Sequence, residues 1–148
     1  MDSRLIGELT GKGNLRLRSK DIHRAASLLE AAASTAEVAL GIPTNEKSAT
    51  VIFRELYEAI RQLGEALWWA LGYEVVESHE AALLGLQQAD ISRKVNLNKL
   101  DRFRDIRHDA NYSGYKVTVE QAKEIVNFWN ACGSELIIHI RKTAGIQK

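Results

Sequence analysis

Arg107 stands where helical periodicity expects an apolar side chain. If the surrounding stretch is a helix, with about 100° between successive residues, Arg107 falls inside an apolar arc. That arc is formed by Leu97, Leu100, Phe103, Ile106 and Ala110. A guanidinium does not lose its charge, and burying it without a partner would cost several kcal/mol. Arg107 must therefore pair with a carboxylate, reach water, or face a cleft.

Two interpretations of Arg107 follow from these constraints. In the first, it forms an ordinary ion pair within the chain or belongs to a polar subunit interface. In the second, it forms an anion site, because a planar guanidinium on a rigid helix suits a phosphate group. Arg104 and Asn111 lie beside Arg107 on the helical wheel, and Asn111 could add a hydrogen bond. Both interpretations remain open at this point.

The remaining chemistry-bearing residues predict neither a metal site nor a covalent one. The histidines, which are His23, His79, His108 and His139, are scattered without a metal-ligand spacing. We interpret His79 as a packing or surface residue in the first turn of a helix. Cys132 is the single cysteine, which excludes an internal disulfide and a multi-cysteine metal site, and which fits a reducing compartment. We expect no metal and no cofactor.

The composition is that of one ordinary globular domain. Of the 148 residues, 45% are hydrophobic and 26% are charged, which argues against a disordered or fibrous chain. The net charge of +1 argues against a surface that grips nucleic acid as a whole, although it leaves room for a local basic patch. No signal peptide and no apolar run of roughly 20 residues is evident, so we expect a cytoplasmic protein without a membrane span.

We expect helices to position these residues. The chain has a single proline, and β-sheet proteins usually contain more turn-forming residues than this. The apolar spacing predicts an all-α fold, an antiparallel bundle of four to five helices. The expected helices run from Ser19 to about Leu40, from about Lys47 to Leu71, from Ser78 to about Asp90, from about Ser92 to the turn at Tyr112, and from Thr118 through Ile140.

Polar residues mark the expected beginnings of these helices. Ser19, Thr44 or Asn45, and Ser78 are candidate N-caps, and Thr118 with Gln121 has the spacing of a capping box. Residues 1–18 are expected to be a flexible arm, residues 19–143 a single helical domain, and residues 144–148 a C-terminal tail.

The run around Arg107 resembles a known family. Arg104-Asp105-Ile106-Arg107-His108-Asp109-Ala110-Asn111-Tyr112-Ser113-Gly114-Tyr115, followed by a capped helix that begins Val-Thr-Val-Glu-Gln-Ala, is similar to the HEPN family (higher eukaryotes and prokaryotes nucleotide-binding). Gly72-Tyr73 and Ser78-His79-Glu80-Ala81 resemble the segment that precedes this motif. The resemblance covers residues 20–141. It implies a small helical bundle that forms a homodimer, with the cleft between subunits, and that often works beside a nucleotidyltransferase-like antitoxin.

The resemblance also implies which residues would act. The family's catalytic pattern is an arginine, a polar residue, and a histidine after four to six intervening residues; Arg107 and His108 match its first two positions. Tyr112 stands at the third, and an unperturbed tyrosine, with a pKa of about 10, is a poor base. The register from Arg102 to His108 has the right spacing, but it places Phe103 at the polar position and puts Arg102 on the solvent face.

Two functions are therefore expected from the resemblance. The first is a module that binds a nucleotide, RNA or a protein partner through Arg104, Arg107 and Asn111. The alternative is a metal-independent RNase of toxin–antitoxin or defence type, with Arg107, His108 and Tyr112 as its catalytic residues. The departure at Tyr112 favours the binding module.

Overall fold

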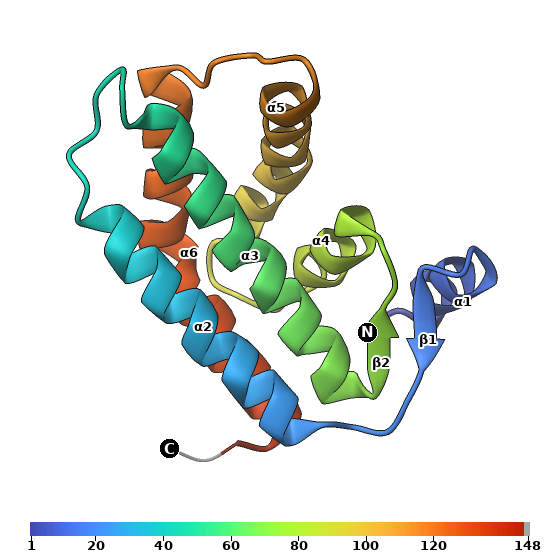
Figure 1. The fold of residues 1–148 in the computed structure, drawn as a ribbon. Helices are drawn as coiled ribbons and strands as arrows, with labels where there is room; N and C mark the ends of the chain where they lie inside the picture. The colour runs from blue at the N-terminus through green and yellow to red at the C-terminus, as the bar shows by residue number, and fades with distance from the viewer. Residues whose placement is uncertain (147–148) are drawn as a thin grey trace.

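The helix α3, Ala49–Leu71, lies at the centre of the molecule. It contacts α2 (Ile22–Leu40), β2 (Tyr73–Val75), α4 (His79–Gln87), α5 (Leu100–Tyr112) and α6 (Val119–Ala144), and Figure 1 shows it crossing the whole structure between them. Its buried residues extend around most of its circumference, as expected for a helix covered by neighbours on several sides. The largest of these are Phe53, Leu56, Tyr57, Ile60, Leu63, Leu67 and Trp68.

The computed structural model describes residues 1–146. In that part of the chain the elements are α1 (Ser3–Gly11), β1 (Leu15–Leu17), α2 (Ile22–Leu40), α3, β2 (Tyr73–Val75), α4 (His79–Gln87), the 3-10 helix η1 (Lys94–Lys99), α5 (Leu100–Tyr112) and α6 (Val119–Ala144). The predicted all-α class is confirmed, with six α-helices and one short two-stranded sheet among residues 1–146. Within the same residues, no helix combines the length and the hydrophobicity needed to cross a bilayer.

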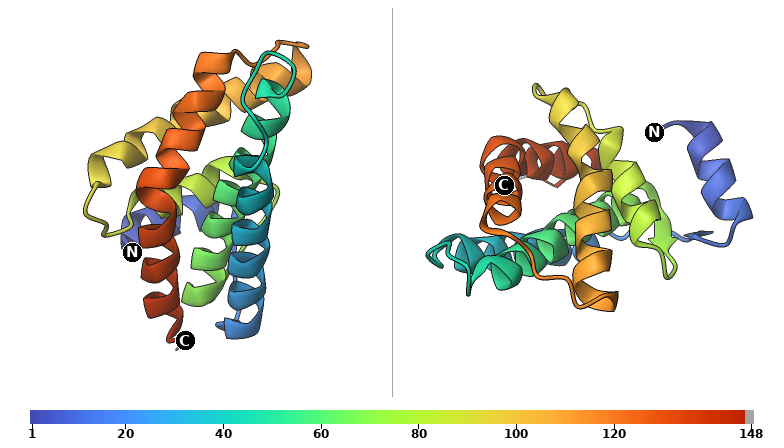
Figure 2. Two further views of the ribbon diagram at one scale, coloured as in Figure 1. Left: turned by 90° about the vertical axis from the view of Figure 1, so that its left-hand side faces the viewer. Right: turned by 90° about the horizontal axis from the view of Figure 1, so that it is seen from above.

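Three long helices, α2, α3 and α6, form the main part of the bundle. Alanines of α2, among them Ala32, Ala36 and Ala39, are buried and allow this helix to lie close beside α3. Helix α6 lies behind the pair, and Figure 2 shows its length running along both. On the other side of α3, the shorter helices α4 and α5 make a second layer, in which Phe103 packs edge-on against Phe53 and Phe128.

The capping predictions hold at two helices and fail at two others. Thr118 and Gln121 form the capping box of α6, and the side chain of Ser78 accepts a hydrogen bond from the backbone N–H of Ala81. Ser19 is not the N-cap of α2. The backbone N–H of Arg18 donates to the carbonyl of Gly72, which keeps the following residues extended, and the helix begins after Asp21.

The boundaries of three other elements also differ from the sequence expectation. The N-cap of α3 is Ser48 rather than Thr44 or Asn45, because Asn45 uses its side chain in a turn and accepts from the backbone N–H of Ser48. Helix α4 ends at Gln87, before the expected Asp90. The segment expected to begin a helix near Ser92 forms η1 first, and Ser92 itself bonds to Glu135 of α6.

Residues 1–18 are not the flexible arm that the sequence predicted. They form α1 and β1, and β1 pairs antiparallel with β2 in the register Leu15 to Val75. Leu9 and Leu15 are buried in a small second core with Trp68. Figure 2 shows α1 at the edge of the molecule, away from α2 and α6. Residues 1–18 therefore fold onto the domain, because Leu9 and Leu15 pack with Trp68 and β1 pairs with β2.

The C-terminal boundary also shifts. Ala144 is the last residue of α6, and Gly145 ends the helix with a positive φ of 74°, so the domain continues past residue 143. Of the expected tail, residues 147–148 lie outside the described residues.

Candidate functional site

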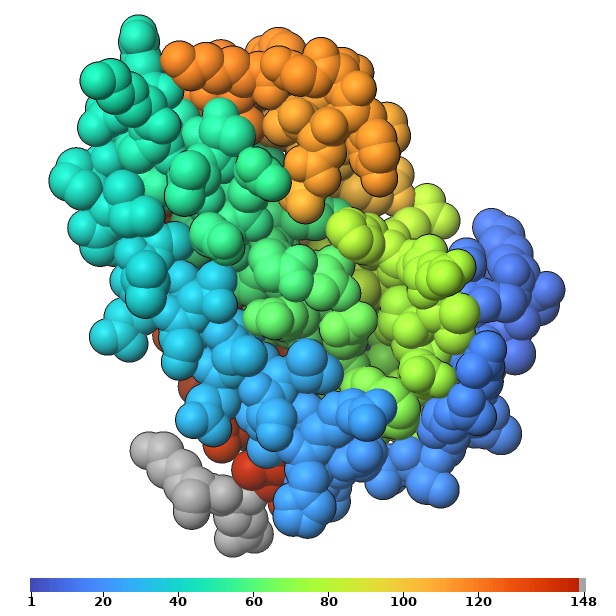
Figure 3. Space-filling view, viewed as in Figure 1, coloured from blue at the N-terminus to red at the C-terminus, as the bar shows by residue number. Residues whose placement is uncertain are grey.

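A hollow of about 410 Å³ opens where α3, the start of α4 and the C-terminal half of α5 meet. Figure 3 shows these three segments, in green, yellow-green and orange, converging on one face of the molecule. The five site residues named from the sequence, Arg104, Arg107, His108, Asn111 and Tyr112, all line this hollow. Tyr57, Glu77 and His79 complete its wall. The hollow therefore joins the site residues of α5, named from sequence, to three side chains of other segments that were not named as site residues.

Arg107 lies half-buried in the wall of this hollow, with a guanidinium that no carboxylate of residues 1–146 neutralises. Among the described residues, neither an ion pair nor a hydrogen bond reaches its side chain, and its buried Nε lacks a partner. Its guanidinium carbon lies 5.9 Å from the centre of the Tyr57 ring, a weak cation–π contact. Arg107 thus keeps hydrogen-bond donors and a positive charge available on the side that faces the hollow.

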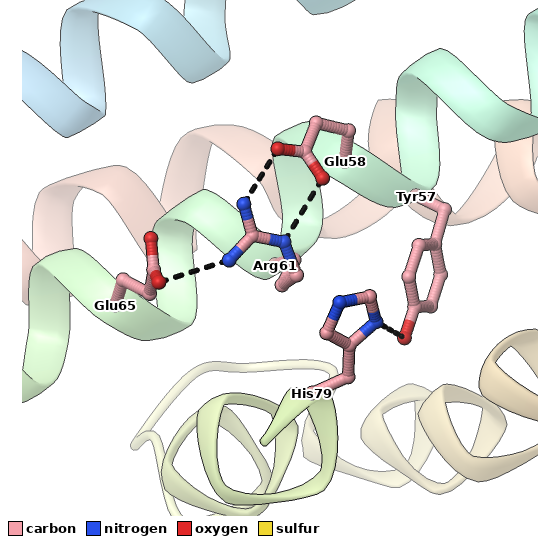
Figure 4. Close-up of polar contacts among 5 residues, drawn as sticks. All are labelled: Tyr57, Glu58, Arg61, Glu65 and His79. Carbon is pink, nitrogen blue, oxygen red and sulfur yellow. Dashed lines mark hydrogen bonds and ion pairs between the residues drawn. The ribbon is translucent and has the colours of Figure 1, made fainter. Parts of the chain in front are cut away.

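Two other arginines near the hollow are neutralised within the chain. Arg104 donates to Glu80, in the first turn of α4, over 2.7 Å. Arg61 is held by Glu58 at 2.6 Å and by Glu65 at 2.9 Å, a cluster drawn in Figure 4. Hydrogen bonding to Arg61 lowers the pKa of Glu58, so this carboxylate stays ionised and satisfied by its own helix.

Arg107 also lines a smaller hollow, against α3. This hollow has a volume of about 340 Å³, and the remaining residues of its wall, Val51, Arg54, Glu55 and Glu58, come from α3. Glu55 and Glu58 give this smaller hollow carboxylates of its own, so a bound anion has access to Arg107 from the larger hollow.

His79 is joined to Tyr57 across the floor of the larger hollow. The Tyr57 hydroxyl lies 3.2 Å from Nδ1 of His79, and the two ring centres are 5.8 Å apart (Figure 4). Burial raises the pKa of Tyr57 to about 12, so its hydroxyl stays protonated near neutrality. Partial burial against α3, and secondarily the charge of Arg61, lower the pKa of His79, which favours the neutral imidazole.

The residues at the family's second and third motif positions lie on the open rim. His108 and Tyr112 pack their rings at 4.7 Å on the outer side of α5, and Tyr112 is 78% exposed. Asn111 is also exposed. In the alternative register, Arg102 bonds to Glu124 of α6 at 2.9 Å and does not line the hollow. The geometry therefore favours Arg107 over Arg102 as the arginine of the site.

Sequence reasoning missed Tyr57, Glu77 and His79. Tyr57 lies on the apolar stripe of α3, and a buried tyrosine hydroxyl needs a partner, which was the available signal. Glu77 has a left-handed backbone with φ of 45°, unusual for a residue other than glycine, and it turns the chain into α4. His79 was interpreted as a packing or surface residue; it is exposed, but it forms part of the hollow.

Metal ligands do not gather in the described part of the chain. No group of three or more His, Cys, Asp or Glu side chains there could hold an ion. Cys132 is buried in the main core, where it packs as a small apolar residue.

Comparison with known families, with curated proteins and with solved structures finds no match to this chain.

Proposed function

We propose that this protein binds a phosphate group of a nucleotide or of RNA in the hollow between α3, α4 and α5. One observation carries the proposal, namely that Arg107 lines the hollow without a carboxylate partner among residues 1–146. The neighbouring Arg61 and Arg104 both have such partners. A binding site for an anion needs a cation whose charge is not already used, and Arg107 meets this requirement.

The surroundings of Arg107 suit a phosphate group as its partner. A phosphate oxygen would supply the acceptor that the half-buried guanidinium lacks, in a charge-assisted hydrogen bond. The side-chain amide of Asn111 and the exposed ring of Tyr112 line the same hollow. These groups would contact the sugar or the base of a nucleotide, since aromatic faces stack on bases.

The HEPN resemblance supports this proposal through the residues that follow Arg107. It implies a HEPN-like bundle and a homodimer, in which two such hollows would lie near each other, beside a nucleotidyltransferase-like antitoxin. His108 and Tyr112 are both largely exposed, and no buried group of the described chain holds either ring in place. This openness favours binding over cleavage through those two residues. Light scattering of the purified protein tests the homodimer.

Binding is tested by calorimetric titration with adenosine monophosphate and with a short 2′-O-methyl RNA, at low salt and in EDTA. The 2′-O-methyl group prevents cleavage at the ribose. We expect both ligands to bind and Arg107→Ala to weaken each by about tenfold or more, because a hydrogen bond to a charged group contributes about 1.5–3 kcal/mol. Arg107→Lys should retain part of the affinity, since it keeps the charge but loses the planar fork.

Arg102→Ala is the matched control, because Arg102 lies on the same helix, is paired with Glu124, and does not line the hollow. Its affinity should equal that of the wild type. Equal affinity of the wild type and Arg107→Ala, or no binding of either ligand, would contradict the proposed function.

A further inference from the structure

Residues 16–24 form an exposed segment at the end of the molecule where β1 leads into α2 (Figure 1). Asp21 is half-buried, and every other residue of this segment is exposed. Two of the exposed residues are large and aliphatic, since Leu17 is 68% exposed and Ile22 is 45% exposed. One exposed aliphatic side chain is ordinary, but two in one short segment mark a candidate interaction surface.

Two hydrogen bonds fix the backbone of this segment against the end of α3. The backbone N–H of Arg18 donates to the carbonyl of Gly72 over 2.7 Å, and that of Asp21 donates to the carbonyl of Trp69 over 3.2 Å. Because the backbone is held in place, the exposed side chains can contact a partner without the cost of ordering the chain. The segment is therefore a preformed surface.

Basic residues surround the two aliphatic side chains. Glu74 lies 3.8 Å from Arg16 and 3.3 Å from Arg18, and a single carboxylate cannot neutralise both arginines. Exposed ion pairs of this kind are also weak. Among residues 1–146, no ion pair reaches Lys20. The segment therefore keeps a net positive charge from its four basic residues, which are Arg16, Arg18, Lys20 and Arg24.

The last turn of α6 adds positive charge at the same end of the molecule. Ala144 of this turn packs in one cluster with Ala25 of α2, so the two helix ends lie side by side. The turn contains Arg141 and Lys142. Since the whole chain has a net charge of only +1, basic residues are concentrated at this end. We call residues 16–24 together with Arg141 and Lys142 the basic end.

The aliphatic residues decide which anionic partner suits the basic end. The phosphates of a nucleic acid would pair with its arginines, but they offer no apolar surface to Leu17 and Ile22. An anionic bilayer offers both, because its headgroups are negative and its acyl chains begin just below them. At the other end of α2, Val38 and Leu40 are exposed as well, but no arginine or lysine occurs in residues 31–46. That surface lacks the complementary charge.

We propose that the basic end docks onto an anionic lipid bilayer, with Leu17 and Ile22 inserted among the headgroups. The neighbouring arginines and lysines contact the negative groups of the lipids. The contact is peripheral, so it needs no helix that spans the bilayer. It is also separate from the Arg107 hollow, because no residue of the basic end lines that hollow.

The first test is flotation of the full chain with lipid vesicles. One set of vesicles is pure phosphatidylcholine, and the other contains about one third phosphatidylserine, which makes the surface potential negative. At about 0.1 M salt, we expect a bound fraction about fivefold or more higher on the anionic vesicles, and at about 1 M salt a loss of this difference through screening. Equal binding to the two sets, or no binding, overturns the proposal.

Two variants separate the aliphatic contribution from that of charge. Ile22→Ser and Lys20→Glu should each lower the bound fraction by about threefold or more. The matched controls are Val38→Ser, an exposed valine on the same helix as Ile22, and Lys47→Glu, an exposed lysine beyond the other end of α2. Both controls should bind as the wild type does. Losses in the controls that equal those in the test variants contradict a defined docking surface.

Insertion into the bilayer is measured at Leu17. On anionic vesicles, Leu17→Trp should gain fluorescence that brominated lipids quench, whereas the added fluorescence of Val38→Trp should not be quenched. An unquenched Leu17→Trp on vesicles that bind the protein shows contact by charge alone, which contradicts the proposed insertion. Circular dichroism spectra should show that each variant is folded.

The outcome for this inference is distinct from the outcome for the proposed function. Arg107→Ala should bind anionic vesicles as the wild type does, and Lys20→Glu should bind the 2′-O-methyl RNA as the wild type does. If Lys20→Glu weakens RNA binding as much as vesicle binding, the basic end is a general anion surface and the bilayer proposal is wrong. Absent vesicle binding together with Arg107-dependent RNA binding overturns this inference and supports the proposed function.

Discussion

Two hollows along α3 each contain an arginine near an aromatic ring, but only one of these arginines is available to a ligand. In the first hollow, between α3, α4 and α5, Arg107 lies 5.9 Å from the Tyr57 ring and has no ion pair among the described residues. In the second, of about 490 Å³ between α2, α3 and β2, Arg24 lies 4.5 Å over the Trp69 ring and 4.0 Å from Asp21.

Two carboxylates and one arginine line the second hollow, whereas two arginines and one carboxylate, Glu77, line the first. Glu65 and Glu74 line the second hollow, and both hold arginines of the chain, Arg61 for Glu65 and Arg16 and Arg18 for Glu74. Its volume exceeds that of the Arg107 hollow, yet a phosphate entering it would meet two carboxylates. Neither the volume of a hollow nor the presence of an arginine identifies an anion site. What matters is whether the arginine is already paired with a carboxylate.

Reversing the two charges gives the largest expected difference between the hollows. Arg107→Glu should weaken binding of the 2′-O-methyl RNA by about a hundredfold or more, because it removes a charge-assisted bond and adds repulsion. Arg24→Glu should leave the affinity within about twofold, as expected for an exposed charge that is already paired. Calorimetric titration measures both. An equal loss in the two variants would show that general surface charge, and not the Arg107 hollow, binds the RNA.

A change at Gly64 should disturb one hollow and spare the other. A Cβ at this position would lie 2.4 Å from the carbonyl oxygen of Ala82, so α4 must move away from α3. Gly64→Ala should lower the free energy of unfolding by about 1–3 kcal/mol, as overpacking does, and weaken ligand binding by widening the Arg107 hollow. Urea denaturation and titration measure the two effects.

Gly7→Ala is the control for Gly64→Ala, because nothing lies within 4 Å of its added Cβ in the helix α1. It should leave the free energy of unfolding unchanged or raise it slightly. If Gly64→Ala is as stable as the wild type, α4 can move away from α3 at little cost. The contact between these helices would then not fix the shape of the hollow.

Releasing a paired arginine should improve binding in one hollow alone. Glu80→Gln frees Arg104 beside Arg107, and we expect about a threefold gain in affinity for the 2′-O-methyl RNA, since a partly exposed charge contributes modestly. Asp21→Asn frees Arg24, but Glu65 and Glu74 remain, so no new binding is expected there. Titration distinguishes the variants, and a gain in Asp21→Asn would contradict the contrast between the hollows.

The smallest expected effect is the pH dependence of binding. Burial lowers the pKa of His79 from its usual 6.5, so the ring is neutral at pH 7. The ring gains a proton as the pH falls through this lowered pKa. The added charge beside Arg107 should then strengthen binding of a phosphodiester about two- to threefold toward pH 5. A diester is used because its own charge does not change in this range. The dependence should disappear in His79→Gln; its persistence there would assign it to another group.

Much of the fold could be predicted from local patterns in the sequence. The apolar spacing located α3 and α6, and Thr118 with Gln121 marked the start of α6, because a capping box involves only residues three positions apart. The arm at residues 1–18 was predicted wrongly, since Leu9 and Leu15 are buried by Trp68, which lies more than fifty positions further along the chain. Such contacts leave no periodic trace in a short segment.

The same division applies to the candidate site. Arg104, Arg107, His108, Asn111 and Tyr112 could be named together because they share one helix, whose geometry relates residues three and four apart. His79 and Tyr57 could not be related to them, because their contact spans 22 positions and depends on how α4 packs against α3.

By itself, the sequence determined that the chain is helical and that Arg107 occupies an apolar arc, since both depend on interactions within a few turns of one helix. Only the tertiary structure decided which charges are neutralised. Arg104 meets Glu80 from 24 positions away, and Arg107 meets no carboxylate in the described chain, because ion pairing depends on distances that packing between helices sets.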